Sequence, residues 1–245
     1  MNKLIRVFSL TNEYLKRYKH LAFIHSDIRA EWANEILAFL NFKIKSQTIK
    51  ARPHSTIFVA NHISYIDIPL LMSSIEDSVF ISKYEVSLWP FFGRASKKIG
   101  TIFVKRSSRK SRSQAREEIE RQILEGSKQI VVFPSGTTSM KNEKVWRKGV
   151  FEIAHKLGIP VQPIRISYSH LREVAYIDKD FFPVHLMNLA TLPEIEASVE
   201  AHPPIIIKNV SADLDYCQKW CSEPSYFSGE ENKSNDHLLL ETANQ

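Results

Sequence analysis

From residue 56 onward, short apolar runs typical of buried strands alternate with segments whose apolar residues recur every three or four positions. The expected strands are residues 56–60, 79–81, 101–105, 129–133, 161–167, 172–177 and 196–199, and the expected helices are 68–75, 87–98, 109–125, 147–157 and 211–220. Strands separated by helices favour a covered, mainly parallel sheet. The sequence therefore predicts a single α/β domain with a mainly parallel mixed sheet flanked by helices, and functional groups in the loops at the strand ends.

Residues 3–25 and 28–43 read as two amphipathic helices that precede this body and are flanked by lysine and arginine. Two interpretations are open. Such a basic helical pair suits attachment to an anionic membrane surface, whereas amphipathic helices more commonly cover the core of their own domain. We expect residues 1–45 to form membrane-associating helices, residues 46–221 the main domain, and residues 222–245 a polar, mobile tail.

Several classes of protein are disfavoured by what the chain lacks. No run of about 18 apolar residues suits a membrane-spanning helix, and the first residues are interrupted by Arg6 and Thr11 too early for a secretory signal. With seven glycines, no glycine-rich phosphate loop is visible. Cys217 and Cys221 form no metal-site pattern and fit a reducing compartment. No metal site is expected.

Positive charge is concentrated in two regions of the chain. Residues 1–60 hold ten Lys and Arg against four Asp and Glu, and residues 83–112 hold nine against Glu85 alone. Such fields attract polyanions, including anionic lipid surfaces and phosphorylated substrates. Nucleic acid is not the expected partner, because aromatic residues are not interleaved with the basic clusters as in a stacking platform.

The segment 57–67 is an apolar run that delivers His62 and then Asp67 into a turn. A neutral imidazole can take a proton from an attacking hydroxyl, and a carboxylate bonded to the other ring nitrogen fixes its tautomer. The two side chains converge only if a turn separates two elements, since five residues of ideal helix or strand direct them apart. The alternative is that Asp67 or Ser64 caps the helix that follows.

Four stretches occur in an order that is informative as a set: residues 61–67 (NHISYID), 100–106 (GTIFVKR), 132–139 (VFPSGTTS) and 159–164 (IPVQPI). Together they resemble the sequence blocks of the glycerolipid acyltransferase family, whose bacterial members include 1-acyl-glycerol-3-phosphate acyltransferases. The resemblance extends from about residue 28 to residue 208.

The resemblance implies transfer of a fatty acyl group from acyl-CoA or acyl carrier protein to the free hydroxyl of a lysolipid. The expected acceptor is 1-acyl-sn-glycerol-3-phosphate, which would give phosphatidic acid. By this analogy His62 is the general base and Asp67 orients it. A thioester already carries a good leaving group, so an activated hydroxyl and oxyanion stabilisation suffice without a cofactor. The implied protein is peripheral, at the cytoplasmic face of the membrane.

The same resemblance assigns substrate-binding residues. Arg106 matches the phosphate-binding arginine of the family, and its fork of donors suits phosphate oxygens. Lys83 and Lys105 are weaker candidates, with a solvated surface lysine as the alternative. Ser135 stands where the family usually has a glutamate associated with acceptor binding, while Gly136 and Thr137 match and bring donors close to phosphate.

Because Ser135 replaces this glutamate, the identity of the acceptor lipid is left open. Another lysolipid, such as lyso-ornithine lipid or a lysophospholipid, is the close alternative within the same chemistry. From a different class comes a non-catalytic lipid-binding protein, which the presence of both His62 and Asp67 disfavours.

Overall fold

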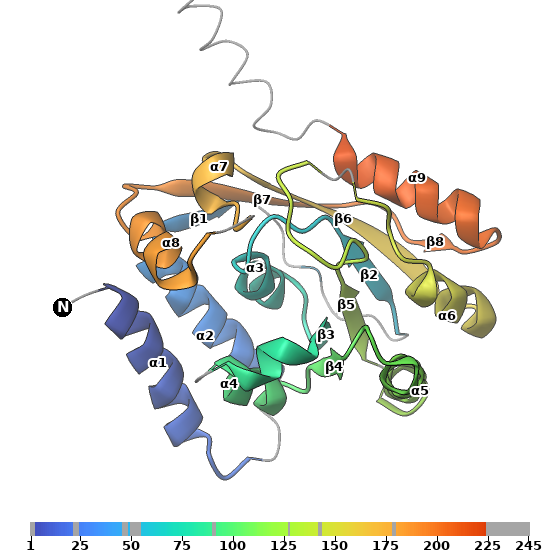
Figure 1. Ribbon diagram of the computed structural model, residues 1–245, viewed down its shortest axis with the longest axis horizontal. Coiled ribbons are helices and arrows are strands. Elements are labelled where there is room, and N and C mark those ends of the chain that lie inside the picture. The colour runs from blue at the N-terminus through green and yellow to red at the C-terminus, as the bar shows by residue number, and fades with distance from the viewer. Residues whose placement is uncertain are drawn as a thin grey trace, which may run out of the picture.

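A mixed sheet of eight strands forms the centre of the described part of the chain (Figure 1). The computed structural model describes residues 3–21, 25–45, 49, 55–89, 92–126, 128–141, 144–177 and 180–223. The strands are β1 (Phe42–Lys45), β2 (Ile57–Ala60), β3 (Ser78–Lys83), β4 (Ile102–Val104), β5 (Gln129–Val132), β6 (Pro160–Tyr168), β7 (Ile195–Ala201) and β8 (Ile205–Ile206).

The sheet has the order β1-β7-β6-β2-β5-β3-β4, with β8 beside β6. Strand β2 is parallel to both neighbours, β5 and β6, and β3 is parallel to β4 and β5. Among the described strands the antiparallel pairs are β6 with β7 and β6 with β8. The predicted mainly parallel mixed sheet is confirmed, and the carboxyl ends of β2, β3, β4 and β5 meet along one edge, where loops gather functional groups.

Helices cover both faces of the sheet. They are α1 (Lys3–Arg17), α2 (Ser26–Phe39), α3 (Asp67–Ser74), α4 (Phe92–Lys98), α5 (Arg109–Gly126), α6 (Gly149–Leu157), α7 (Leu171–Val174), α8 (Phe182–Leu189) and α9 (Val210–Ser222), with a 3₁₀ helix η1 (Tyr84–Leu88) before α4. Figure 1 shows α1, α2, α3 and α8 on one side of the molecule and α5, α6 and α9 on the other.

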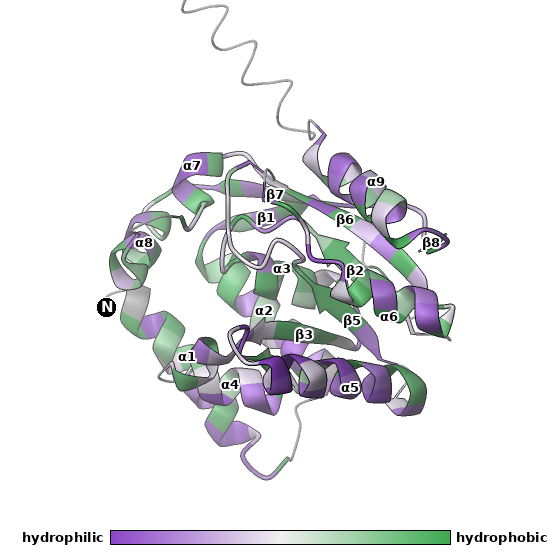
Figure 2. Cartoon of the chain, turned by 45° about the vertical axis from the view of Figure 1, so that its right-hand side comes forward, coloured by the Kyte–Doolittle hydropathy of each residue, from purple (hydrophilic) through white to green (hydrophobic). Residues whose placement is uncertain are grey.

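Two apolar cores result from the alternation of side chains along the strands. In β2, Phe58 and Ala60 join the core beneath α2, α3 and α8, whereas Ile57 and Val59 join the core beneath α5, α6 and α9. All four side chains are buried. Figure 2 shows β2, β3 and β5 coloured as hydrophobic, while α5 is largely hydrophilic. Helix α5 buries Ala115, Ile119 and Ile123, spaced four residues apart.

The N-terminal helices are part of this same architecture. In α1, Val7, Leu10 and Tyr14 are buried and belong to the core that contains Phe58 and Ala60. The second of the two interpretations, in which amphipathic helices cover the core of their own domain, therefore accounts for the apolar side of α1. No helix in the described part of the chain has the length and apolar character required to cross a membrane.

Four expectations about elements were wrong. The expected helix 3–25 ends at Arg17, and residues 18–20 form a turn. Residues 172–177 do not form a strand: Val174 and Ala175 pack into the core at the end of a short helix, α7, whose amides bond back to His170 and Leu171. The expected helix 87–98 is divided into η1 and α4. The expected helix 28–43 ends earlier, because Asn41 adopts a left-handed φ of 62° and turns the chain into β1.

The predicted tail, residues 222–245, begins at the last residue of α9 and, from residue 224, lies outside the described residues.

Candidate active site

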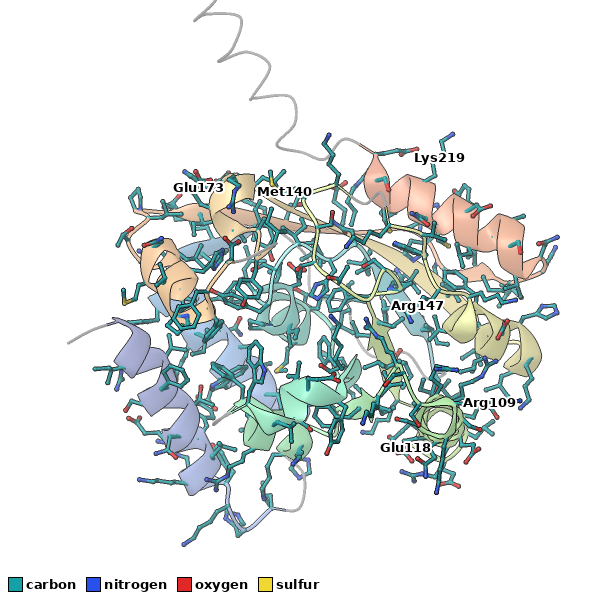
Figure 3. The ribbon with its side chains drawn as sticks, viewed as in Figure 1. Arg109, Glu118, Met140, Arg147, Glu173 and Lys219 are labelled. Atoms are coloured by element: carbon teal, nitrogen blue, oxygen red, sulfur yellow. The ribbon has the colours of Figure 1, made fainter. Side chains whose placement is uncertain are left out.

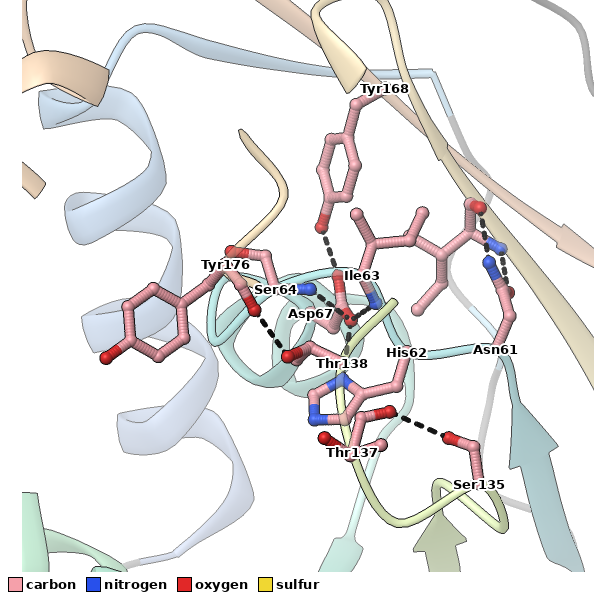
Figure 4. A network of polar contacts seen from close by, with 11 residues as sticks. Asn61, His62, Ile63, Ser64, Asp67, Ser135, Thr137, Thr138, Tyr168 and Tyr176 are labelled. Carbon is pink, nitrogen blue, oxygen red and sulfur yellow. Dashed lines mark hydrogen bonds and ion pairs between the residues drawn. The ribbon is translucent and has the colours of Figure 1, made fainter. Parts of the chain in front are cut away.

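The site begins where β2 ends. Asn61 follows the strand and makes two hydrogen bonds to the backbone of Ile166 in β6: its Nδ2 donates to the carbonyl at 2.9 Å, and the Ile166 amide donates to its Oδ1 at 2.8 Å (Figure 4). This pair ties the loop after β2 to the adjacent strand. His62 is the next residue, so its position is fixed relative to the sheet.

Four hydrogen-bond donors converge on the carboxylate of Asp67, which is 0% exposed (Figure 4). Oδ2 lies 2.7 Å from His62 Nδ1 and accepts from the amides of Ile63 at 2.7 Å and Ser64 at 3.0 Å. Oδ1 accepts from the Tyr168 hydroxyl at 2.7 Å. The predicted turn therefore brings His62 and Asp67 into direct contact.

The capping alternative does not describe these contacts. Asp67 is the first residue of α3, but its carboxylate binds amides that precede the helix, those of Ile63 and Ser64. The Ser64 hydroxyl is buried and has no hydrogen-bond partner among the described residues. Neither side chain caps α3, and the turn is instead closed around the carboxylate.

The geometry fixes the tautomer of His62. A carboxylate only accepts hydrogen bonds, so in the neutral imidazole His62 Nδ1 carries the hydrogen and Nε2 holds the lone pair. Burial, followed by the negative charge of Asp67, raises the pKa of the Tyr168 hydroxyl well above its usual value, which keeps Tyr168 a donor. The arrangement leaves a basic ring nitrogen directed away from the carboxylate.

Phe133, the residue after β5, packs against one face of the His62 imidazole. Its ring stacks on His62 with centroids 3.9 Å apart and an interplanar angle of 11°. The His62 side chain nonetheless remains 16% exposed, so the imidazole is reachable from solvent. The His62 carbonyl also accepts from the Ser139 amide at 2.8 Å, which anchors the 133–139 loop to it.

The loop after β5 requires glycine at position 136. Gly136 has a φ of 71°, a region that favours glycine, and its carbonyl accepts a hydrogen bond from Arg106 Nη1. A Cβ atom there would lie 2.6 Å from Arg106 Nη1. Ser135 is buried and its Oγ donates to the Thr137 carbonyl at 3.0 Å (Figure 4). The structure thus places Arg106, Gly136, Ser135 and Thr137 together.

Arg106 lies among cationic side chains and one carboxylate, that of Glu85. Burial lowers the pKa of Arg106, and the positive charge of Arg147 lowers it further. Burial also lowers the pKa of Lys83. The positive charges of Arg106, Arg147 and Lys144 lower it further, whereas Glu85 opposes the shift. Four cationic side chains therefore form a cluster: Lys83, Arg106, Lys144 and Arg147.

Lys105, in contrast, is exposed and is not among the charges that perturb Arg106 or Lys83. Its backbone amide bonds the Ser111 hydroxyl at 2.9 Å. Sequence reasoning missed Tyr168, Lys144 and Arg147. They lie far along the chain from the residues they approach, and no local pattern distinguishes them from other tyrosines or basic residues.

Two cavities flank the site. An apolar cavity of about 140 Å³ lies among α1, α2, α3, α4 and α8, and Tyr65 and Ile66 from the His62–Asp67 turn line it. A second cavity of about 810 Å³ lies between α5 and α6, and Arg106, Phe133 and Gly136 line it. In the described residues no group of three or more His, Cys, Asp or Glu side chains is arranged to hold a metal ion.

Comparison with known proteins gives a family match and several relatives. The acyltransferase family model matches residues 41–167, just over half of the 245-residue chain. The chain is 33% identical over 138 residues to a lyso-ornithine lipid O-acyltransferase of Pseudomonas aeruginosa, covering 56% of this chain and 52% of the relative. It is 28% identical over 143 residues to a 1-acyl-sn-glycerol-3-phosphate acyltransferase of Neisseria meningitidis serogroup B, covering 56% and 54%. The chain thus spans about half the length of these curated relatives.

The fold has a solved counterpart. The crystal structure of the 1-acyl-sn-glycerophosphate acyltransferase PlsC from Thermotoga maritima superposes with a TM-score of 0.60 and 19% identity, covering 95% of this chain and 98% of that one. At this identity the likeness concerns the fold, and it agrees with a single α/β domain that includes N-terminal helices.

Proposed function

The chain belongs to the acyltransferase family, and from this premise we propose that it transfers a fatty acyl group from a thioester to the free hydroxyl of a lysolipid. The observation that carries the proposal is the pairing of His62 with the buried carboxylate of Asp67 at 2.7 Å, next to a loop whose Gly136 contacts Arg106. A base for a hydroxyl and a cationic site for a phosphate are the two elements that this reaction requires.

In the proposed reaction, His62 Nε2 removes the proton of the acceptor hydroxyl as its oxygen attacks the thioester carbonyl carbon. Asp67 holds the ring and stabilises the imidazolium. The tetrahedral intermediate collapses with cleavage of the carbon–sulfur bond, and the imidazolium returns its proton to the departing thiolate. Transfer is direct, with no acyl-enzyme. The thioester supplies the activation, so the chemistry requires no cofactor beyond acyl-CoA or acyl carrier protein as co-substrate.

We propose 1-acyl-sn-glycerol-3-phosphate as the acceptor, giving phosphatidic acid. The cluster of Lys83, Arg106, Lys144 and Arg147 suits a phosphate monoester, because several cations share its two negative charges. Arg106, Lys83, Gly136, Thr137 and Ser135 are the proposed binding residues, and exposed Lys105 is the weakest of the original candidates.

Lyso-ornithine lipid is the second candidate acceptor. Ser135, in place of the glutamate that the family usually carries, leaves the acceptor open, and one observation favours this lipid: relatives such as the Pseudomonas protein are named for it. Incubation of purified protein with a mixed lysolipid panel and both thioester donors, followed by lipid mass spectrometry, separates the two. Phosphatidic acid as the main product supports the first choice, and acylation of lyso-ornithine lipid alone overturns it. Vesicle binding without consumption of any thioester would favour a lipid-binding protein instead.

Replacing Arg106 with alanine should raise the KM for lysophosphatidate by about 10- to 100-fold, since a charge-assisted hydrogen bond to phosphate is lost. A lysolipid without phosphate should be affected much less. Arg121→Ala is the matched control, because Arg121 pairs with Glu118 and Glu125 on an exposed face of α5. Equal KM values in Arg106→Ala and the wild type, measured by initial rates, would remove Arg106 from the acceptor site.

We also propose that the protein is peripheral at the cytoplasmic face of the membrane. Because the apolar side of α1 is buried, a different surface must supply most of the lipid contact. Large exposed apolar side chains occur on η1 and α8, where the rings of Trp89 and Phe182 lie 5.7 Å apart. We call this surface the apolar patch; its exposed members are Leu88, Trp89, Phe181, Val184 and Met187.

Replacing Leu88 with glutamate should weaken co-sedimentation with anionic vesicles, because a charge would replace apolar area that enters the interface. Leu124 on α5 is a matched control, since it is 68% exposed and Leu88 is 66% exposed. Leu124→Glu should sediment like the wild type. If both variants sediment equally, the apolar patch is not the contact surface.

A further inference from the structure

The cavity of about 810 Å³ between α5 and α6 is lined by more cationic side chains than one acceptor phosphate requires. Its floor is apolar and includes Ile81, Val104 and Val132. We call it the arginine cavity after its cationic lining residues: Arg106, Arg109, Arg112, Arg116, Arg147 and Lys148. Figure 3 labels Arg109 on α5 and Arg147 in the segment that leads to α6.

Much of this charge is not neutralised within the described residues. Arg116 and Lys148 both approach Glu152, at 2.7 and 3.4 Å. Arg109, Arg112 and Arg147 form no ion pair with any described carboxylate, and Arg112 donates to a neutral acceptor, the backbone carbonyl of Arg106. Arg109, Arg112 and Arg116 are spaced three and four residues apart, so they lie along one face of α5.

The cavity also reaches the candidate active site. Phe133 lines it and stacks on the His62 ring with centroids 3.9 Å apart. Arg106 and Gly136 line it as well, at the loop that follows β5. A ligand in the cavity can therefore contact Phe133, whose ring separates it from the proposed base, while anionic groups of the ligand lie near the arginines of α5.

We propose that the arginine cavity binds the phosphorylated nucleotide of a coenzyme A-type thioester donor. This inference rests on the proposed acyl transfer and decides between the two donors that the proposal leaves open. A volume of about 810 Å³ is in the range of pockets for compact organic ligands, which run from roughly 300 to 1,000 Å³. The apolar floor suits a base or a pantetheine arm, and the surplus arginines suit several phosphate groups.

A folded carrier protein suits the cavity less well. It would present an acidic surface and a single phosphodiester, whereas the cationic side chains here, although mostly exposed, are grouped around a cavity that also has an apolar lining. Arg121, which lies outside the cavity on the same helix, is already paired with Glu118 and Glu125. Of the α5 arginines, Arg109 and Arg112, which have no ion pair among the described residues, thus line the cavity.

Calorimetric titration of the full chain with adenosine 3′,5′-bisphosphate and with coenzyme A tests the inference without relying on turnover. Wild-type protein should bind both. Arg109→Ala and Arg112→Ala should each weaken binding by about 10- to 100-fold, the effect of losing one charge-assisted hydrogen bond to phosphate. Arg121→Ala should bind like the wild type. Binding should also weaken as salt is raised.

Absence of nucleotide binding by the wild type, or equal affinities in all three variants, would overturn the inference. Acyl transfer from carrier-protein thioester alone, unaffected by Arg109→Ala and Arg112→Ala, would also overturn it while the proposed acyl transfer stands. Nucleotide binding that depends on both arginines, in a protein that acylates no lysolipid, would support the cavity assignment and reject the proposed function. The two failures are therefore distinguishable.

Discussion

Replacing His62 with alanine is expected to lower acyl transfer by about 10²–10⁴-fold, the range for loss of a general base. The imidazole lies 2.7 Å from the Asp67 carboxylate through Nδ1, which leaves Nε2 as the only basic ring atom available to an acceptor hydroxyl. Initial rates with a lysolipid acceptor and a thioester donor measure the effect. The loss should appear in kcat, because the proton is transferred in the chemical step.

The fold should survive this change. The ring is partly exposed, so its removal deletes one hydrogen bond and the stack on Phe133 but opens no sealed cavity. Circular dichroism and the unfolding midpoint check this point. His20→Ala, at an exposed position of the N-terminal segment, is the matched control and should retain wild-type rates. Turnover of His62→Ala at the wild-type rate would exclude the imidazole as the base.

Replacing Asp67 with asparagine is expected to reduce kcat by about 10²–10⁴-fold, because the negative charge that stabilises the imidazolium is lost. The shape of the side chain is retained. The amide oxygen can still accept from the amides of Ile63 and Ser64 if its nitrogen is directed at Tyr168, whose hydroxyl then accepts. The cost in the free energy of unfolding should therefore stay near 1–2 kcal/mol, the difference between charge-assisted and neutral hydrogen bonds.

The Tyr168→Phe variant distinguishes the effect of the Asp67 charge on activity from the effect of the hydrogen bonds around Asp67 on stability. This substitution removes the donor to Oδ1 and leaves Oδ2 and its contact with His62 in place. Stability should fall by about 1 kcal/mol, whereas activity should fall far less than in Asp67→Asn. In the double variant that combines Asp67→Asn with Tyr168→Phe, the new side-chain amide nitrogen at position 67 has no acceptor. The loss in free energy of unfolding, measured with urea, should therefore exceed the sum of the losses in the two single variants. Wild-type activity in Asp67→Asn would show that the carboxylate only shapes the turn.

The central part of the site follows from sequence because it is local. His62 and Asp67 are five residues apart in one turn, and the apolar run before them identifies the strand that delivers them. Gly136 and Ser135 likewise follow a recognisable buried strand, β5. The identity of these residues and their neighbouring strand is enough to predict their place at the sheet edge.

The remaining contacts depend on strand order, which no local pattern contains. Tyr168 reaches Asp67 because β6 lies next to β2, although 101 residues separate the two side chains. Arg147 approaches Arg106 because the loop after β5 turns back on its own start, where the Arg147 amide donates to the Pro134 carbonyl at 3.1 Å. The expected strand at 172–177 was wrong for a related reason, since burial of Val174 and Ala175 is satisfied in a short helix as well as in a strand.

Strand β6 supports the His62 turn at two points. Ile166 in the strand bonds Asn61, and Tyr168 at its end bonds Asp67. The arginines of α5, in contrast, touch neither of these supports. Under the proposed assignments, donor binding and proton transfer therefore depend on different elements. Substitutions on α5 should change the preferred acyl carrier while the proposed base keeps its alignment, which is a direct route to acyltransferases with altered cosubstrates.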